Sequence, residues 1–191
     1  FRLINISFIN ELAIFCQKIG IDINDVVKAA ATKPYGFMPF YSSVGVGGHC
    51  IPVDPLYLAS AAKAAGAPTK FIELADQVNQ EMPGYFVGRA EEKIGGLNNK
   101  KVLVMTHRIE LCSQTSKMLT SFGVTNKVVD SKANLDDQVD YSCFVAMVET
   151  LNNRLNDNVL DISDVGLVII DEAHYNSFTK LFKFFEKSFI L

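Results

Sequence analysis

The hydrophobic pattern of the chain changes at residues 101–105, which read Lys-Val-Leu-Val-Met. Before this stretch, apolar residues recur at helical spacing, as in residues 3–19 and 23–30. After it, short runs rich in β-branched residues alternate with amphipathic stretches, which is typical of buried parallel strands separated by helices. The sequence therefore predicts an α/β protein overall, with an all-α helical domain at residues 1–100 and a parallel α/β domain at residues 101–191.

Composition limits the classes to which the chain can belong. Of its 191 residues, 49% are hydrophobic and 20% are charged, which is enough apolar material for a core. The net charge of −3, with basic residues spread along the chain, argues against a strong nucleic-acid footprint. No apolar run approaches the length of a membrane span, and no charged-then-apolar leader is present, so we expect no membrane partner. The four cysteines form no C-x-x-C pair and no metal-ligand spacing, which favours free thiols and a cytoplasmic location.

Secondary structure follows from periodicity and from the glycines and prolines that interrupt it. Helices are predicted at residues 3–19, 22–32, 55–65 and 68–94. Buried strands are predicted at residues 102–105, 143–148 and 165–170.

One glycine-rich segment carries the most reactive chemistry in the sequence. Residues 45–50 read Gly-Val-Gly-Gly-His-Cys, and Asp54 followed by Pro55 predicts the start of a helix just after Cys50. The positive end of a helix favours the thiolate form of a nearby cysteine, which is the nucleophilic form. Cys50 is therefore a candidate nucleophile; the alternative is a plain surface turn with a buried cysteine.

Residues 47–55, Gly-Gly-His-Cys-Ile-Pro-Val-Asp-Pro, resemble the active-site loop of the UDP-glucose/GDP-mannose dehydrogenase family. The His-Cys-Ile-Pro-Val-Asp-Pro form is similar to the branch that acts on UDP-N-acetylhexosamines such as UDP-N-acetylmannosamine, in polysaccharide biosynthesis. The resemblance runs from Phe1 to about Lys101. It implies an NAD-dependent oxidation in which the cysteine attacks a sugar aldehyde, a hydride transfer to NAD leaves a thioester, and water releases the uronate.

The resemblance also implies roles by position. Cys50 would be the nucleophile, and Asp54 would help to activate the water. Contacts with a UDP-sugar substrate would come from Phe40, Tyr41, Gly45, Gly47, Gly48 and His49. The helical half would be the central domain of the family and would support a homodimer.

NAD itself has no predicted site in this chain. Residues 45–48 begin like the G-x-G-x-x-G fingerprint, but Cys50 takes the third glycine position and no strand precedes the segment. We therefore expect the NAD-binding domain of the family to be absent here.

A second candidate site lies at residues 166–174, which read Gly-Leu-Val-Ile-Ile-Asp-Glu-Ala-His. This is an apolar strand that ends in two carboxylates. Ligands of open α/β sheets bind at this edge, and paired carboxylates suit Mg²⁺ and an attacking water. The alternative is an ordinary strand followed by an acidic helix cap.

Asp-Glu-Ala-His at residues 171–174 resembles motif II of superfamily 2 helicases of the DEAH-box type. Residues 105–114 look like the family's Ia segment, which touches single-strand phosphates, and residues 145–151 resemble the next strand-to-helix element. The resemblance implies part of the first RecA-like domain, with ATP and Mg²⁺ as cofactors and weak nucleic-acid binding.

This resemblance assigns Asp171 and Glu172 to Mg²⁺ held through ATP, with Glu172 also acting as the catalytic base. Nucleic-acid contacts fall to Thr106, Arg108 and Gln114. No G-x-x-x-x-G-K-[ST] segment occurs in the sequence, so we expect the loop that cradles ATP phosphates to be absent.

The two resemblances meet at residues 101–105, and no single function requires both. Three functions remain open: a nucleotide-sugar 6-dehydrogenase fragment that is inactive alone, a superfamily 2 helicase or ATPase fragment, and a non-physiological fusion with neither activity. Because the parallel sheet would lack its first strand and phosphate-loop helix, we also expect the helical half to be the more stable one.

Overall fold

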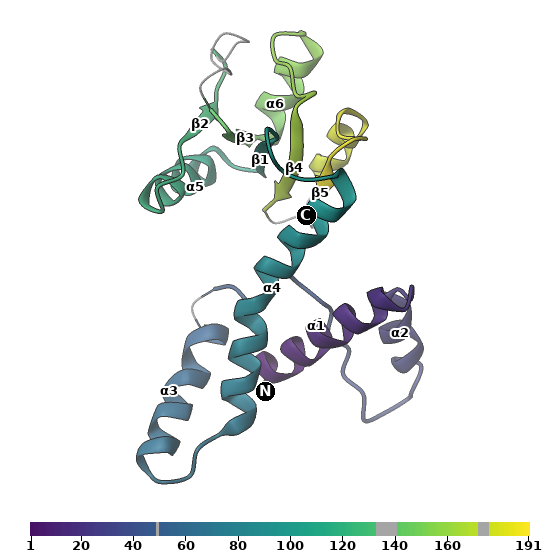
Figure 1. Ribbon diagram of the computed structural model, residues 1–191, viewed down its shortest axis with the longest axis vertical. Helices are drawn as coiled ribbons and strands as arrows, with labels where there is room; N and C mark the ends of the chain where they lie inside the picture. The colour runs from purple at the N-terminus through teal and green to yellow at the C-terminus, as the bar shows by residue number, and fades with distance from the viewer. Residues whose placement is uncertain (49, 133–140, 172–175) are drawn as a thin grey trace. The chain divides into compact units, whose positions relative to one another are not determined.

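A computed structural model of the chain describes residues 1–48, 50–132, 141–171 and 176–191 (Figure 1). The chain divides into two compact units, residues 1–87 and residues 88–191. Within the described residues, no helix combines the length and the apolar character that crossing a membrane requires.

The first unit is helical, as the periodicity predicts. Its elements are α1 (Arg2–Lys18), α2 (Ile23–Ala30), α3 (Cys50–Ala64) and most of α4 (Lys70–Ile94). Gly20 follows α1 with φ of 74°, and Gly66 follows α3 with φ of 77°. This left-handed backbone favours glycine and ends both helices where the sequence places their ends.

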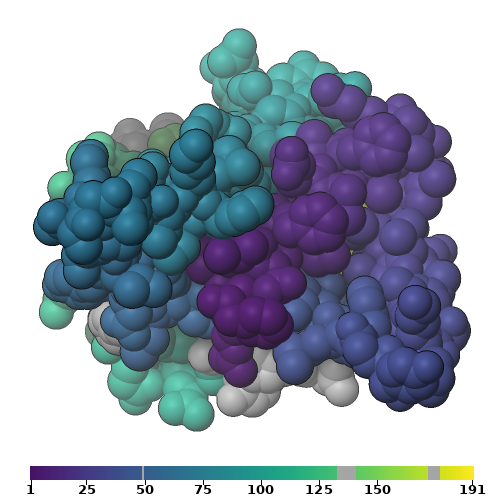
Figure 2. Space-filling view, turned by 90° about the horizontal axis from the view of Figure 1, so that it is seen from below, coloured from purple at the N-terminus to yellow at the C-terminus, as the bar shows by residue number. Residues whose placement is uncertain are grey.

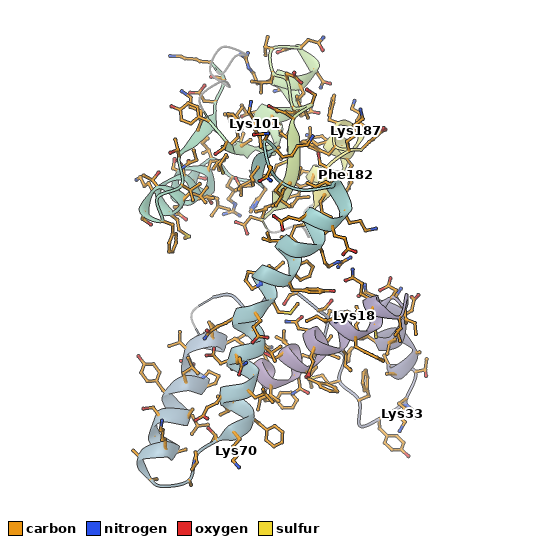
Figure 3. The ribbon with its side chains drawn as sticks, in the orientation of Figure 1. Lys18, Lys33, Lys70, Lys101, Phe182 and Lys187 are labelled. Atoms are coloured by element: carbon orange, nitrogen blue, oxygen red, sulfur yellow. The ribbon has the colours of Figure 1, made fainter. Side chains whose placement is uncertain are left out.

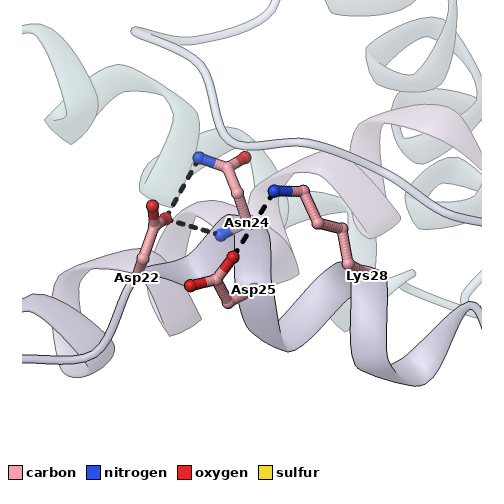
Figure 4. Close-up of polar contacts among 4 residues, drawn as sticks. All are labelled: Asp22, Asn24, Asp25 and Lys28. Carbon is pink, nitrogen blue, oxygen red and sulfur yellow. Dashed lines mark hydrogen bonds and ion pairs between the residues drawn. The ribbon is translucent and has the colours of Figure 1, made fainter.

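The start of α2 shows why a helix begins where it does. The side chain of Asp22 accepts a hydrogen bond of 2.8 Å from the backbone N–H of Asn24, which satisfies one of the free donors of the first turn (Figure 4). Asp25 and Lys28, one turn apart, form an exposed ion pair at 3.4 Å. A negative first turn and a positive last turn both agree with the helix dipole.

The start of α3 differs from the prediction. The sequence suggests a helix from Pro55 with Asp54 as its cap, but α3 begins at Cys50 and Pro55 lies inside it. Pro52 then takes the third helical position, where a backbone N–H has no intrahelical partner to lose. Ile51 packs against a buried cluster, and this packing accounts for the extra turn. The Asp54 cap is therefore wrong, and Cys50 is itself the first helical residue.

Two small apolar clusters hold the helical unit together. One joins α1, α3 and α4 through Leu3, Ala59, Ile72 and Ala75. The other joins α1 and α2 through Ile9, Cys16, Ile23 and Val27. Much of α1 remains at the surface, as the purple side chains of Figure 2 show.

The second unit alternates strands and helices. Its described elements are β1 (Lys101–Thr106), α5 (Ile109–Ser121), β2 (Asn126–Val129), β3 (Cys143–Met147), α6 (Val148–Asn156), β4 (Val165–Ile170), the 3₁₀ helix η2 (Asn176–Phe184) and β5 (Phe189–Ile190). The three strands predicted from apolar runs are confirmed. The sequence analysis missed β2 and β5, because one carries Asn and Lys and the other has only two residues.

The five strands form one sheet in the order β2-β3-β1-β4-β5, and every described pair is parallel. Strand β1, where the two family resemblances meet, lies at the centre of the sheet. Its Val104 pairs with Val145 of β3 and with Ile169 of β4. At its start, Lys101, labelled in Figure 3, places its Nζ 2.8 Å from a carboxylate oxygen of Asp164. Residues 101–105, where the two resemblances meet, therefore belong structurally to the α/β unit.

Both faces of the sheet are buried, as expected for parallel strands. One face packs against α6 and η2; its largest buried side chains include Leu103, Met105, Leu151, Phe178 and Phe185. The opposite face packs against α5 through Val104, Cys112, Cys143 and Val145. The alternation of β1 side chains between two faces puts Leu103 and Val104 in different clusters.

Candidate active site around Cys50

Cys50 differs from the other cysteines in position. It is exposed at the first residue of α3, whereas Cys16, Cys112 and Cys143 are buried, and all four thiols are free. It also lines a cavity of about 450 Å³ inside the helical unit. The structure thus places the thiol at an accessible helix N-terminus. The alternative interpretation, a surface turn with a buried cysteine, requires a buried thiol and does not agree with this exposure.

Two charged side chains share this cavity with the thiol. Asp54 follows Cys50 by four residues on α3, so the two side chains lie on the same face of the helix, one turn apart. Arg2 lines the cavity from α1. The remaining walls are apolar: Phe1, Leu3, Ile4, Ile51, Pro55, Leu58 and Ile72. The site can therefore offer a sulfur nucleophile, a carboxylate and a cation in a mainly apolar setting.

The residues before the thiol occupy different places. Phe40 is half-buried against the cluster of α1 and α2 and meets the ring of Phe1 edge to face, with centroids 5.7 Å apart. Since Phe1 lines the cavity, Phe40 supports its wall. Tyr41 is exposed.

The three loop glycines also divide. Gly47 and Gly48 are exposed, and space is open around both α-carbons, so the backbone there is free to approach a ligand. Gly45 lies against Asn79 of α4. His49 lies outside the described residues.

The second candidate site is at the carboxyl edge of the sheet. Asp171 directly follows β4, and its backbone N–H donates a 3.0 Å hydrogen bond to the carbonyl of Met105 in β1. Glu172, predicted as the partner of Asp171 in binding Mg²⁺ and as the base, lies outside the described residues. Among the residues that are described, no group of three His, Cys, Asp or Glu side chains could hold a metal ion.

The predicted nucleic-acid contacts are placed unequally. Thr106 is fully buried, and its hydroxyl donates to the Arg108 carbonyl at 3.0 Å and lies 3.0 Å from the sulfur of Cys112. That hydroxyl is engaged inside the protein. Arg108 and Gln114 are exposed, so their side chains are accessible to a ligand.

The buried thiols of the α/β unit are held in their neutral form. Burial raises the pKa of Cys143. Burial also raises the pKa of Cys112, against the opposing effect of its hydrogen bond with Thr106. These thiols are poor nucleophiles near neutral pH, which leaves Cys50 as the reactive candidate.

Neither NAD nor ATP fits the described residues. The segment at residues 45–48 precedes α3, but no strand leads into it, as a dinucleotide fingerprint needs. The sequence contains no phosphate loop for ATP.

Three residues near the loop were not singled out by the sequence analysis: Arg2 in the cavity, and Asn10 and Asn79, which hydrogen-bond the loop backbone. Arg2 belongs to the matching stretch at the start of the chain, which was a usable signal. Asn10 lies in the same matching stretch, whereas Asn79 is distant in sequence from the loop and gave no signal.

Two families match the chain in different parts. The central domain of the UDP-glucose/GDP-mannose dehydrogenase family matches residues 1–81. The type III restriction enzyme res subunit matches residues 89–191. Through its second part, the chain belongs to the res-subunit family. Residues 1–81 resemble the dehydrogenase central domain, so the chain is a chimera of two families, as the sequence predicts.

Individual relatives support the dehydrogenase match. The chain is 38% identical over 129 residues to UDP-N-acetyl-D-glucosamine 6-dehydrogenase of Pseudomonas aeruginosa, covering 68% of this chain and 29% of that protein. It is 29% identical over 181 residues to UDP-N-acetyl-D-mannosamine dehydrogenase of Methanococcus vannielii, covering 94% of this chain and 40% of that protein. The chain thus spans less than half the length of these curated relatives.

Solved structures show the fold. A UDP-glucose dehydrogenase from Pyrobaculum islandicum matches with a TM-score of 0.57 and 24% identity, covering 89% of this chain and 40% of that one. UDP-D-ManNAc dehydrogenase from Pyrococcus horikoshii matches with a TM-score of 0.53 and 21% identity, covering 92% and 46%.

This likeness extends into the α/β unit, so strand order becomes informative. The sheet runs β2-β3-β1-β4-β5, whereas the classic dinucleotide-binding sheet has the order 3-2-1-4-5-6. Relative to that order the second and third strands are exchanged, so the sheet of residues 88–191 is parallel but does not have the classic dinucleotide-binding order.

Proposed function

We propose that the helical unit supplies the covalent nucleophile of a nucleotide-sugar 6-dehydrogenase that acts on a UDP-N-acetylhexosamine. The observation that carries the proposal is the cavity in which Cys50, Asp54 and Arg2 meet. The relatives include dehydrogenases of UDP-N-acetyl-D-glucosamine and UDP-N-acetyl-D-mannosamine, which supports this substrate class.

The chemistry proposed for this chain is covalent capture. The sulfur of Cys50 attacks the C6 aldehyde carbon, the carbonyl π electrons move to oxygen, and that oxygen takes up a proton to give a hemithioacetal. Oxidation to the thioester needs NAD, which these residues do not fit. Asp54, one turn along α3, would act later by activating the water that releases the uronate.

Substrate contacts in this proposal come from the loop and from the residues just before it. Gly47, Gly48 and Tyr41 are exposed. Phe40 and His49 are included because the family resemblance assigns them this role. The guanidinium of Arg2 is a further candidate for an anionic group of a UDP-sugar, because it presents planar donors suited to phosphate.

Protection from alkylation tests the capture. A UDP-N-acetylhexosamine 6-aldehyde should slow the labelling of Cys50 by iodoacetamide, whereas the parent alcohol should not. Peptide mass mapping measures the labelling. Asp54→Asn should keep the protection, since Asp54 acts after capture. Equal labelling rates with aldehyde and alcohol would remove the basis for a covalent role.

The proposed assembly is a homodimer through the helical unit. Phe8 and Phe15, seven residues apart on one face of α1, are more than half exposed, as are Phe71 and Leu74 of α4. A groove of about 300 Å³, lined by Phe8, Phe71 and Leu74 among others, lies between these helices. Exposed apolar surface of this extent marks an interaction site. Sedimentation should show a dimer that Phe8→Asp converts to monomer and that Lys18→Asp, a surface control on α1, does not.

We infer a second function, weak nucleic-acid binding, for residues 88–191. The family match of residues 89–191 favours it, and Arg108 and Gln114 are exposed just after β1. Asp171 remains the proposed Mg²⁺ residue, with Glu172 as its partner and base. Fluorescence anisotropy with a single-stranded oligonucleotide at low salt should detect binding that Arg108→Ala weakens more than Lys187→Ala does.

The remaining alternative is a fusion with neither activity. It predicts no protection of Cys50 by the aldehyde and no effect of Arg108→Ala on nucleic-acid affinity. The proposed location is the cytoplasm, because all four thiols are free.

A further inference from the structure

The loop that leads to Cys50 is held by two asparagines from different helices. Asn10 of α1 accepts a 2.8 Å hydrogen bond from the backbone N–H of Ser43. Asn79 of α4 accepts a 2.5 Å hydrogen bond from the backbone N–H of Val46. Within this span, the Ser43 hydroxyl donates to the Gly45 carbonyl at 3.0 Å. Residues 43–46 are thus fixed at both ends by side chains more than thirty residues away in sequence.

Asn10 is placed for this contact at a cost to folding. It is fully buried, and in the described part of the chain its Nδ2 has no hydrogen-bond partner. A buried donor without a partner destabilises the folded state, because its hydrogen bond to water is lost on folding and is not replaced. A leucine, which has the same branching of side-chain heavy atoms, would avoid that cost, so packing alone does not explain an asparagine here.

Asn79 is fitted closely to the loop. A β-carbon at Gly45 would lie 3.0 Å from Asn79 Oδ1 and 3.3 Å from its carbonyl oxygen. Gly45 also has φ of 135°, a backbone that other residues rarely adopt. The absence of a side chain at residue 45 is therefore what lets the loop come close enough for the Val46 hydrogen bond.

The two segments that flank the thiol rest on one cluster. Val46, next to the Asn79 contact, and Ile51, next to Cys50, both pack against the buried residues that join α1, α3 and α4. Between them, Gly47 and Gly48 have open space around them. The hydrogen bonds at residues 43–46 therefore fix the backbone directly before Gly47 and Gly48, in the segment of the chain that leads to Cys50.

We infer that Asn79 and Asn10 are positioning residues for the Cys50 nucleophile. They hold the backbone of residues 43–46 against the same cluster on which Ile51 packs, and so restrict the segment that leads to the thiol at the start of α3. The inference rests on the proposed function for the role of Cys50 as a nucleophile. The anchoring of the loop by the two asparagines can be measured without any substrate.

Amide hydrogen exchange of the intact chain tests the anchoring. Asn79→Leu removes the acceptor and keeps the branching of the side chain, and Asn79→Asp keeps an acceptor oxygen. We expect the Val46 amide to exchange about tenfold faster in Asn79→Leu and at nearly the original rate in Asn79→Asp. Asn10→Leu should accelerate exchange at Ser43 in the same way. The buried amides of α1 and α4 serve as internal references and should not change.

Three results would overturn the inference: unchanged exchange at Val46 in Asn79→Leu, equal acceleration in Asn79→Leu and Asn79→Asp, or acceleration spread evenly over residues 1–87. The last would show that Asn79 only stabilises the unit. A failure of aldehyde protection at Cys50 with the exchange pattern intact would instead reject the proposed function and keep the anchoring.

Discussion

The helical unit and the α/β unit dispose of their apolar side chains in opposite ways. All but four of the large hydrophobic residues that are exposed in the described chain lie in residues 1–87; the four in residues 88–191 are Ile109, Met118, Phe122 and Phe182. The α/β unit covers both faces of its sheet, with α5 on one side and α6 and η2 on the other. The helical unit relies on two small clusters.

The two arrangements imply different stabilities for the two units on their own. The sequence analysis expects the α/β half to be weaker, because it would lack a strand and a phosphate-loop helix. The packing favours the reverse order, since burial of apolar surface is the main stabilising term and the larger core lies in residues 88–191. The exposed helices instead need a cover, which the proposed homodimer would supply.

The largest expected effect is in limited proteolysis. Chymotrypsin should cut the helical unit first, at exposed aromatic residues such as Tyr35, Tyr57 and Phe71, and leave a resistant fragment within residues 88–191. Intact mass at low digestion identifies the fragment. Survival of residues 1–87 with early cleavage at Phe182, which is 41% exposed and labelled in Figure 3, would reverse the order of the two units.

Two buried methionines, one in each unit, allow the packing of the two units to be compared at single side chains. Met82 in the helical unit and Met105 in β1 both have no exposed surface. Met105 belongs to the large sheet cluster, whereas no described cluster contains Met82. We expect Met105→Ala to lower the free energy of unfolding of its unit by about 3 kcal/mol and Met82→Ala to cost its unit about 2 kcal/mol or less.

The control for this pair is Met118→Ala in α5, where 61% of the side chain is exposed. It should change the free energy of unfolding by less than about 0.5 kcal/mol. Pulse proteolysis in urea, read by mass spectrometry, reports each unit separately. A larger loss for Met82→Ala than for Met105→Ala would show that the helical unit has the tighter core.

Sequence patterns predicted the parts of the fold that repeat. Helical periodicity and the glycines at 20 and 66 gave the helices, and runs such as residues 165–170 gave the central strands. The short edge strands β2 and β5 lack an apolar run and depend on pairing with β3 and β4, so local sequence could not reveal them.

The candidate site was predictable only where its chemistry is local. Cys50 and Asp54 lie in one motif, one helical turn apart, and the structure brings them to one cavity. The contacts of Asn10 and Asn79 with the loop arise from helix packing across more than thirty residues, which no spacing rule encodes. The helix start at Cys50 was missed for a similar reason, because tertiary packing of Ile51 outweighs the cap signal of Asp54.

The labelling rates of the four cysteine thiols allow the two units to be compared. In the folded chain Cys50 should react with iodoacetamide first, because it alone is exposed. Cys16, buried in the small cluster of the helical unit, should follow, and Cys112 and Cys143 should react last, about tenfold or more slowly than Cys50.

Labelling in guanidinium chloride is the control, since all four thiols should then react at similar rates. If Cys112 or Cys143 reacts before Cys16 in the folded chain, the α/β unit opens more readily than the helical unit. That order would contradict the expectation that the α/β unit is more tightly packed and opens less readily.

The smallest expected effect is a pH dependence confined to the α/β unit. Burial raises the pKa of both Cys143 and Cys112 in the folded state, so above the ordinary thiol pKa of about 8.5 the unfolded state loses protons that the folded state keeps. Stability from these thiols is fully present below that pH and falls as pH rises toward the raised pKa, by at most about 1.4 kcal/mol per pH unit for each thiol. Cys143→Ala should flatten this alkaline slope for residues 88–191, and Cys16→Ala, a buried thiol of the other unit, should leave it unchanged. Urea unfolding of the three proteins between pH 8 and pH 10 measures the slopes, and identical slopes for Cys143→Ala and the unaltered chain would show that Cys143 is not kept neutral by burial.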